Sequence, residues 1–70
     1  MNDWIVVQIG YVVFGNGLTK EDAVTMAKEY LDKDHIAQAW DVADFKSLAS
    51  AVDGELVLCR WFQYIEYMSR

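Results

Sequence analysis

Apolar residues dominate the first and last stretches of the chain, and both stretches have the composition of β-strands. Residues 3–14 are rich in Trp, Ile, Val, Tyr and Phe, the β-branched and aromatic types that suit a pleated surface. Both alternating rows of this segment are apolar, as in a strand covered on its two faces. Residues 55–68 have the same character. We therefore predict a long strand at each end of the chain and expect the two strands to pair antiparallel.

Glycines interrupt and follow the first predicted strand. Gly10 indicates a bulge or a close approach of another backbone. The run Gly15-Asn16-Gly17 predicts a turn, because glycine and asparagine tolerate positive φ. A phosphate loop would lie at such a strand-to-helix position, but this run lacks the third glycine of the dinucleotide fingerprint and the lysine of a P-loop. We interpret it as a plain turn.

A helix is predicted to begin at Thr19 and to end near Lys33. Thr19 can cap the free amides of the first turn, and Asp22 three residues later makes a variant of the capping box. Apolar residues recur at helical spacing on one stripe, which consists of Ala23, Met26, Ala27, Tyr30 and Leu31.

The middle of the chain is ambiguous between helix and strand. In residues 34–42 one set of apolar positions matches a helical face and another matches an alternating strand. We favour a helix, and an extra short strand near 36–42 is the alternative. Asp41 or Asp44 can cap a second helix, which should end before Gly54. Its apolar face would consist of Phe45, Leu48, Ala49 and Val52.

These elements predict an α+β fold, a small two-layer domain in the order β-α-α-β with two helices packed on one face of the terminal strands. Seventy residues leave room for one domain, residues 1–70, and one core. The lone Cys59 cannot close an internal disulfide, and one His with one Cys cannot build a four-ligand zinc site. A two-stranded sheet is marginal by itself. Dense packing or association must therefore stabilise the chain.

Composition and charge narrow the classes of partner. Hydrophobic residues make up 54% of the chain and aromatic residues 14%, above the roughly 45–50% apolar share of ordinary globular proteins, so part of the excess should face a partner. The net charge of −5 repels phosphate backbones and disfavours direct nucleic-acid binding. Neither an export signal nor a membrane span is indicated. The free thiol fits a reducing, cytoplasmic location.

Candidate chemistry is sparse. Asp32, Asp34, His35 and Asp41 resemble a hard-metal or acid/base cluster, but their spacing matches no known metal loop, and a solvated helix-end cluster is the favoured interpretation. Cys59 lies among apolar residues and is interpreted as a small buried hydrophobe. A single His leaves no Ser-His-Asp arrangement. We predict no enzyme activity and no metal or cofactor.

One resemblance covers barely half of the chain. The run from Trp4 to Gly10, followed by a capped helix, resembles the start of a SPOR repeat, a peptidoglycan-binding module. The second half of the chain does not follow the repeat pattern, so the resemblance transfers no function.

The sequence therefore predicts a non-enzymatic, acidic protein-binding module. We expect it to be an inhibitor or adaptor that occupies a surface of a larger protein complex. The complex could be one that handles nucleic acid, as for inhibitors of the anti-restriction or anti-CRISPR type. The expected aromatic anchors are Trp4, Trp61, Tyr64 and Tyr67. The carboxylates expected to imitate phosphates against a basic protein surface are Glu21, Asp22, Glu29, Asp32, Asp34, Asp41 and Asp44. The alternative is a homo-oligomeric regulatory or small-ligand-binding subunit, and a homo-oligomer is expected in either case.

Overall fold

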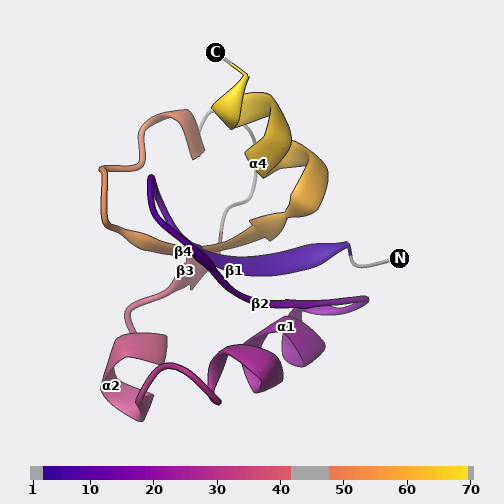
Figure 1. Cartoon of the computed structure of the whole chain (residues 1–70), viewed down its shortest axis with the longest axis vertical. Coiled ribbons are helices and arrows are strands. Elements are labelled where there is room, and N and C mark those ends of the chain that lie inside the picture. Colours follow the sequence, from indigo (N-terminus) through magenta and orange to yellow (C-terminus); the bar gives the residue numbers. More distant parts are fainter. Residues whose placement is uncertain (1–2, 42–47, 70) are drawn as a thin grey trace.

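The computed structural model describes residues 3–41 and 48–69, and these form a four-stranded sheet with helices on both sides (Figure 1). The strands are β1 (Trp4–Gln8), β2 (Val13–Gly17), β3 (Trp40–Asp41) and β4 (Leu56–Arg60). The helices of the described residues are α1 (Lys20–Ala27), α2 (Lys33–Ile36) and α4 (Trp61–Met68). The predicted α+β class is confirmed.

The sheet has the order β2-β1-β4-β3 and mixes parallel with antiparallel pairs. The strands nearest the two chain ends pair antiparallel as predicted, with Trp4 opposite Arg60 and Gln8 opposite Leu56. β3 pairs parallel with β4, which confirms the extra short strand near 36–42. The Trp40 indole donates to Glu55 Oε2 at 2.8 Å and ties this short strand to the start of β4.

The predicted first long strand is instead a hairpin of β1 and β2. The chain turns around Gly10, where φ is +84°, and the register shifts at Phe14 of β2, opposite Val6 and Val7 of β1. The predicted turn at Gly15-Asn16-Gly17 is therefore wrong, because these residues are the second half of β2.

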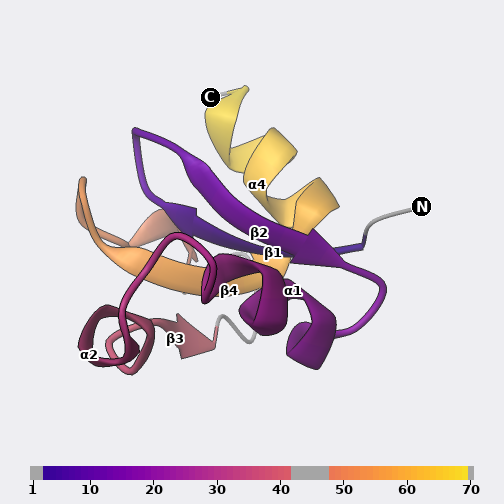
Figure 2. The ribbon, with the colours of Figure 1, turned by 60° about the horizontal axis from the view of Figure 1, so that its bottom comes forward.

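β2 lies beside α1 (Figure 2), and the glycines of β2 allow close packing of the two elements. A Cβ on Gly15 would overlap the Ala23 carbonyl oxygen and lie 2.7 Å from the Ala27 nitrogen. A Cβ on Gly17 would lie 2.9 Å from the Ala23 nitrogen. The small side chains of Ala23 and Ala27 are fully buried on the helix side of this contact.

The predicted second long strand is also wrong beyond Arg60, where α4 begins. Gln63 Oε1 accepts a hydrogen bond from the Arg60 amide at 3.0 Å, which satisfies a backbone donor at the start of the helix. Gln63 and Tyr64 are buried, and Tyr67 follows them at helical spacing. These contacts override the strand propensity of the aromatic residues.

The helix predicted at 19–33 begins as expected but ends early. The Asp22 amide donates to Thr19 Oγ1 at 3.1 Å, which confirms the cap. α1 ends at Ala27, and α2 starts separately with Asp32 as its N-cap. Met26 and Tyr30, expected on the buried stripe, are 39% and 69% exposed.

The helix favoured for residues 34–42 is confirmed only at α2 (Lys33–Ile36). In the segment that follows β3, Asp44 and Phe45 lie outside the described residues. Leu48 is fully buried as expected, whereas Val52, expected on the same apolar face, is 65% exposed.

An apolar cluster lies on each face of the sheet. One consists of Ile5, Val7, Ile9, Leu48, Val57, Cys59 and Tyr64, and the other of Val6, Ala23 and Ala27. α1 and α2 cover one side of the sheet and α4 the other (Figure 1). The helices thus differ from the expected packing on one face, because both rows of β1 are apolar and each needs cover. Within residues 3–41 and 48–69, no helix has the length and apolar character needed to cross a bilayer.

Candidate protein-binding surfaces

The outward side of α4 is an exposed apolar surface, which we call the α4 outer face. It consists of Trp61, Phe62, Ile65 and Met68, which are 41%, 58%, 49% and 59% exposed. Their spacing places them on one side of the helix, and Figure 1 shows α4 on the outside of the described part of the fold, above the sheet. Scattered exposed hydrophobic residues are normal, whereas several of them on one side of a helix make that side a candidate interaction surface.

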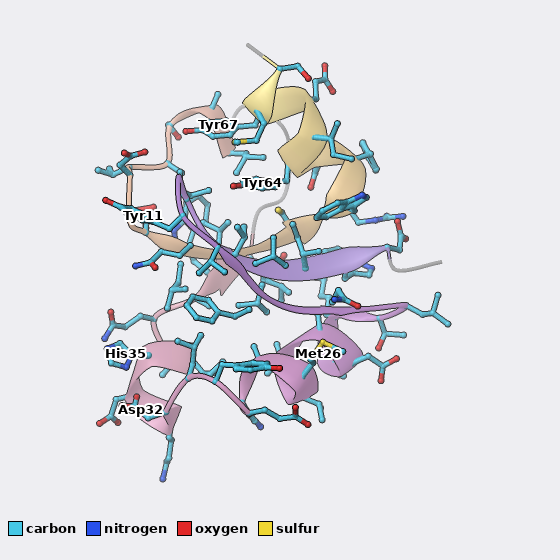
Figure 3. All side chains as sticks on the ribbon, viewed as in Figure 1. Tyr11, Met26, Asp32, His35, Tyr64 and Tyr67 are labelled. Atoms are coloured by element: carbon cyan, nitrogen blue, oxygen red, sulfur yellow. The ribbon has the colours of Figure 1, made fainter. Side chains whose placement is uncertain are left out.

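The inward side of α4 fixes how the helix is presented. Tyr64 is only 8% exposed, and its ring stacks on that of Tyr67 with centroids 6.2 Å apart. Figure 3 shows both rings on the inner side of the helix. Burial raises the pKa of the Tyr64 phenol. Of the aromatic anchors predicted on this segment, Trp61 is therefore exposed, Tyr64 belongs to the core and Tyr67 is half-buried.

Trp4 lies between two cations on the other side of the sheet. Lys20 Nζ and Arg60 Cζ are each 5.0 Å from the centroid of its ring, in the range of cation–π attraction. Lys20 also pairs with Asp41, and Arg60 with Asp3. Trp4 is half-buried within these contacts, so it is a less accessible anchor than Trp61.

Arg60 connects that cluster to the α4 outer face. Its guanidinium carbon lies 5.6 Å from the Phe62 ring centroid, while the same group contacts Trp4. Its Nε atom is buried and has no hydrogen-bond partner among the residues that the structure describes. Arg60 thus places a cation at the rim of the exposed apolar surface, where arginine is enriched in protein interfaces.

The predicted acidic residues that the structure describes lie among lysines. Asp41 pairs with Lys20. Asp44 lies outside the described residues. The remaining carboxylates, Glu21, Asp22, Glu29, Asp32 and Asp34, are exposed along α1 and α2, where they alternate with Lys20, Lys28 and Lys33. The described part of this surface carries both signs of charge.

Asp32 and His35 act together at the start of α2. The His35 amide donates to Asp32 Oδ1 at 2.9 Å, and His35 Nδ1 lies 2.9 Å from the same oxygen. The backbone hydrogen bond is the main reason that the pKa of the Asp32 carboxyl is lowered. Figure 3 shows the pair on α2 at the surface. This geometry favours the helix-end interpretation of the cluster. Among the residues the structure describes, no group of three or more His, Cys, Asp or Glu could hold a metal ion.

Cys59 is fully buried in the sheet and is not disulfide-bonded. Burial raises the pKa of its thiol to about 12. A thiol that keeps its proton at neutral pH and has no access to solvent is a poor nucleophile. The environment matches the interpretation of Cys59 as a core residue.

Sequence reasoning missed a groove between β2 and α1, which we call the β2 groove. It has a volume of about 320 Å³ and is lined by Val12, Val13, Phe14, Asn16, Met26 and Tyr30. It was missed because residues 3–14 were assigned to one strand buried on both sides and Met26 with Tyr30 to a buried stripe. A hairpin turn at Gly10 would have separated β2 from β1. The position of β2 in the sheet would then have been a separate question.

Comparison with models of protein families, with curated proteins and with solved structures finds no match for this chain.

Proposed function

We propose that this chain is a non-catalytic protein-binding module, an adaptor or inhibitor that binds a larger protein through the α4 outer face. The observation that carries the proposal is the exposure of Trp61, Phe62, Ile65 and Met68 on one side of a helix whose other side is anchored by buried Tyr64. An apolar helix face presented in this way fits an apolar groove of a partner, which is a recurrent mode of recognition.

The composition of this face fits an interface anchor. Trp61 and Phe62 supply large rigid rings, and Met68 supplies a flexible side chain that adapts to irregular pockets. Arg60 stacks against Phe62 at the rim. Trp and Arg are enriched among the residues that contribute most to binding energy.

The acidic character of the chain suggests what surrounds the partner's groove. A net charge of −5 speeds association with a basic surface and disfavours acidic ones. An inhibitor of a nucleic-acid-handling complex is one form of this proposal, because such complexes expose basic surfaces. In that form, exposed carboxylates such as Glu21, Asp22 and Asp34 steer the encounter, and the α4 outer face provides the affinity.

Quantitative capture of partners from an extract of the source cells tests the proposal. The double variant Phe62→Lys/Ile65→Lys should reduce recovery of the specific partner by at least about tenfold, as for central interface residues. A matched control, Thr25→Lys/Gln38→Lys, adds the same charge at exposed polar positions and should reduce it far less. Equal recovery by the α4 double variant and the unmodified chain would contradict the proposal.

Neutralising the carboxylates separates the two surfaces. The variant Glu21→Gln/Asp22→Asn/Asp34→Asn should bind more slowly and with a weaker dependence on salt, while the complex dissociates at an unchanged rate. Loss of binding in this variant, with retention in the α4 double variant, would assign recognition to the acidic residues instead.

A further inference from the structure

The two edges of the sheet are protected very differently. At one edge, the described part of β3 has two residues and includes Asp41, and short charged edge strands resist pairing with other chains. At the other edge β2 has five residues, VFGNG, with neither a charge nor a proline. An edge strand of this kind is a template for a further strand.

The charge distribution identifies where two copies of this chain could meet. Each copy carries a net charge of −5, so contact between copies is opposed wherever carboxylates approach each other. Residues 4–19 contain no charged residue, and they include the whole of β2. The flanking charges on the α1 side are Asp22 in the first turn of the helix and Glu29 beyond its end. Repulsion between two copies should therefore be weak at the β2 edge.

The β2 groove supplies apolar surface beside this edge. Met26 and Tyr30 expose large side chains between α1 and β2, and Val12 and Phe14 line the same groove. Figure 3 shows Met26 on the α1 helix that borders β2. A strand added at β2 would therefore bury side chains as well as satisfy backbone groups.

We propose that β2 pairs antiparallel with β2 of a second copy of this chain, so that two sheets join into one. The Asp3 amide donates to the Gly17 carbonyl at 2.9 Å, so the Gly17 backbone faces β1. By the alternation of a strand, the backbone of Asn16 faces outward. A two-fold axis at Asn16 gives the copies identical surroundings.

The same register limits how many residues of the two strands can pair. The bulge opposite Val6 and Val7 confines regular pairing to the segment around Asn16, so the interface is small. The dimer should therefore dissociate on dilution. It uses a surface separate from the α4 outer face and stands independently of the function proposed above.

Sedimentation equilibrium over a wide range of concentrations tests the dimer. The chain should shift from a mass of 8.1 kDa to twice that value as the concentration rises. Asn16→Pro removes the outward amide at an edge position that tolerates proline, and it should abolish the shift. Phe62→Lys/Ile65→Lys should keep it. A constant single-chain mass, or a dimer lost only in the α4 variant, would overturn the proposal.

Cross-linking tests the register and does not depend on the folding of the proline variant. Residues directly opposite each other in a hydrogen-bonded antiparallel pair have Cα atoms about 5.5 Å apart, within disulfide range. Asn16→Cys should form a covalent dimer under mild oxidation, while buried Cys59 adds little background. Thr25→Cys, on the exposed side of α1, should cross-link at least about tenfold more slowly. Equal rates for the two variants would overturn the proposed register.

Discussion

At the scale of single residues, missing or small side chains determine how the sheet is covered. Gly15 and Gly17 leave β2 without a Cβ where the backbone of α1 passes, and Ala23 and Ala27 keep the opposing helix surface flat. The same strand would be ambiguous in isolation, since a Gly-Asn-Gly run also suits a turn. Packing against α1 decides between the two structures.

Gly15→Ala should destabilise the chain because the added methyl group meets backbone atoms of Ala23 and Ala27, which cannot rotate away. The cost expected for such overpacking is about 1–3 kcal/mol in the free energy of unfolding, measured by urea denaturation. Asn16→Ala, at the neighbouring position of the same strand, is the control and should change stability much less. A Gly15→Ala variant as stable as the unmodified chain would show that α1 packs elsewhere.

The buried thiol of Cys59 should make stability depend on pH in the alkaline range. Its pKa is about 12 in the folded chain, against a reference value of 9.0. As the pH rises above 9.0, the unfolded chain loses this proton and the folded chain keeps it. The contribution is complete below that pH and is lost between these two pKa values, with a slope of at most about 1.4 kcal/mol per pH unit.

Urea denaturation at several pH values between 7 and 10.5 would measure this dependence. Cys59→Ala removes one titrating group and should flatten the decline, although buried Tyr64, whose pKa is also raised, remains in both chains. An identical decline in the two chains would exclude Cys59 as its cause.

At the scale of elements, the sequence was a good guide to the middle of β1, to β4 and to the start of α1. β-branched residues predicted the two strands that pair across the chain, and Thr19 with Asp22 predicted the cap. It was a poor guide where one residue type suits two structures. The aromatic residues after Arg60 suit a strand by composition. They form a helix instead, because Gln63 accepts a hydrogen bond from the Arg60 amide and Tyr64 packs into the core.

The α4 outer face could be predicted only in part, and the β2 groove could not be predicted. Trp61 was expected to be an exposed anchor, and its side chain is 41% exposed at the start of α4. Phe62, Ile65 and Met68 were not singled out, because in a strand they alternate between two faces and form no common surface. The β2 groove depends on Met26 and Tyr30 lying beyond the edge of the sheet, which no local pattern reveals.

The orientation of α4 has a direct consequence for stability. In a strand, residues 62 and 64 would share one face, whereas in α4 Phe62 is 58% exposed and Tyr64 only 8%. Phe62→Lys should change the free energy of unfolding by no more than about 0.5 kcal/mol. Tyr64→Ala should reduce it by about 3 kcal/mol or more, through the lost contacts and the cavity. Similar effects of the two substitutions in urea denaturation would contradict a helix in this orientation.

At the scale of the whole molecule, the two exposed apolar surfaces differ in character and in position. The α4 outer face is a compact helical surface with an arginine at its rim. The β2 edge combines an uncharged edge strand with the β2 groove beside it. The first suits a helix-binding groove on another protein, and the second suits a second copy of this chain.

Photo-cross-linking in the source cells would test whether the α4 outer face binds another protein. A photoreactive phenylalanine analogue would replace Phe62 in one variant and Thr25 on α1 in a control. We expect the variant at position 62 to form, only under illumination, a covalent adduct with one distinct larger protein, and the control at position 25 to form none. An adduct formed equally from position 25, or none from position 62, would show that the α4 outer face is not the binding surface.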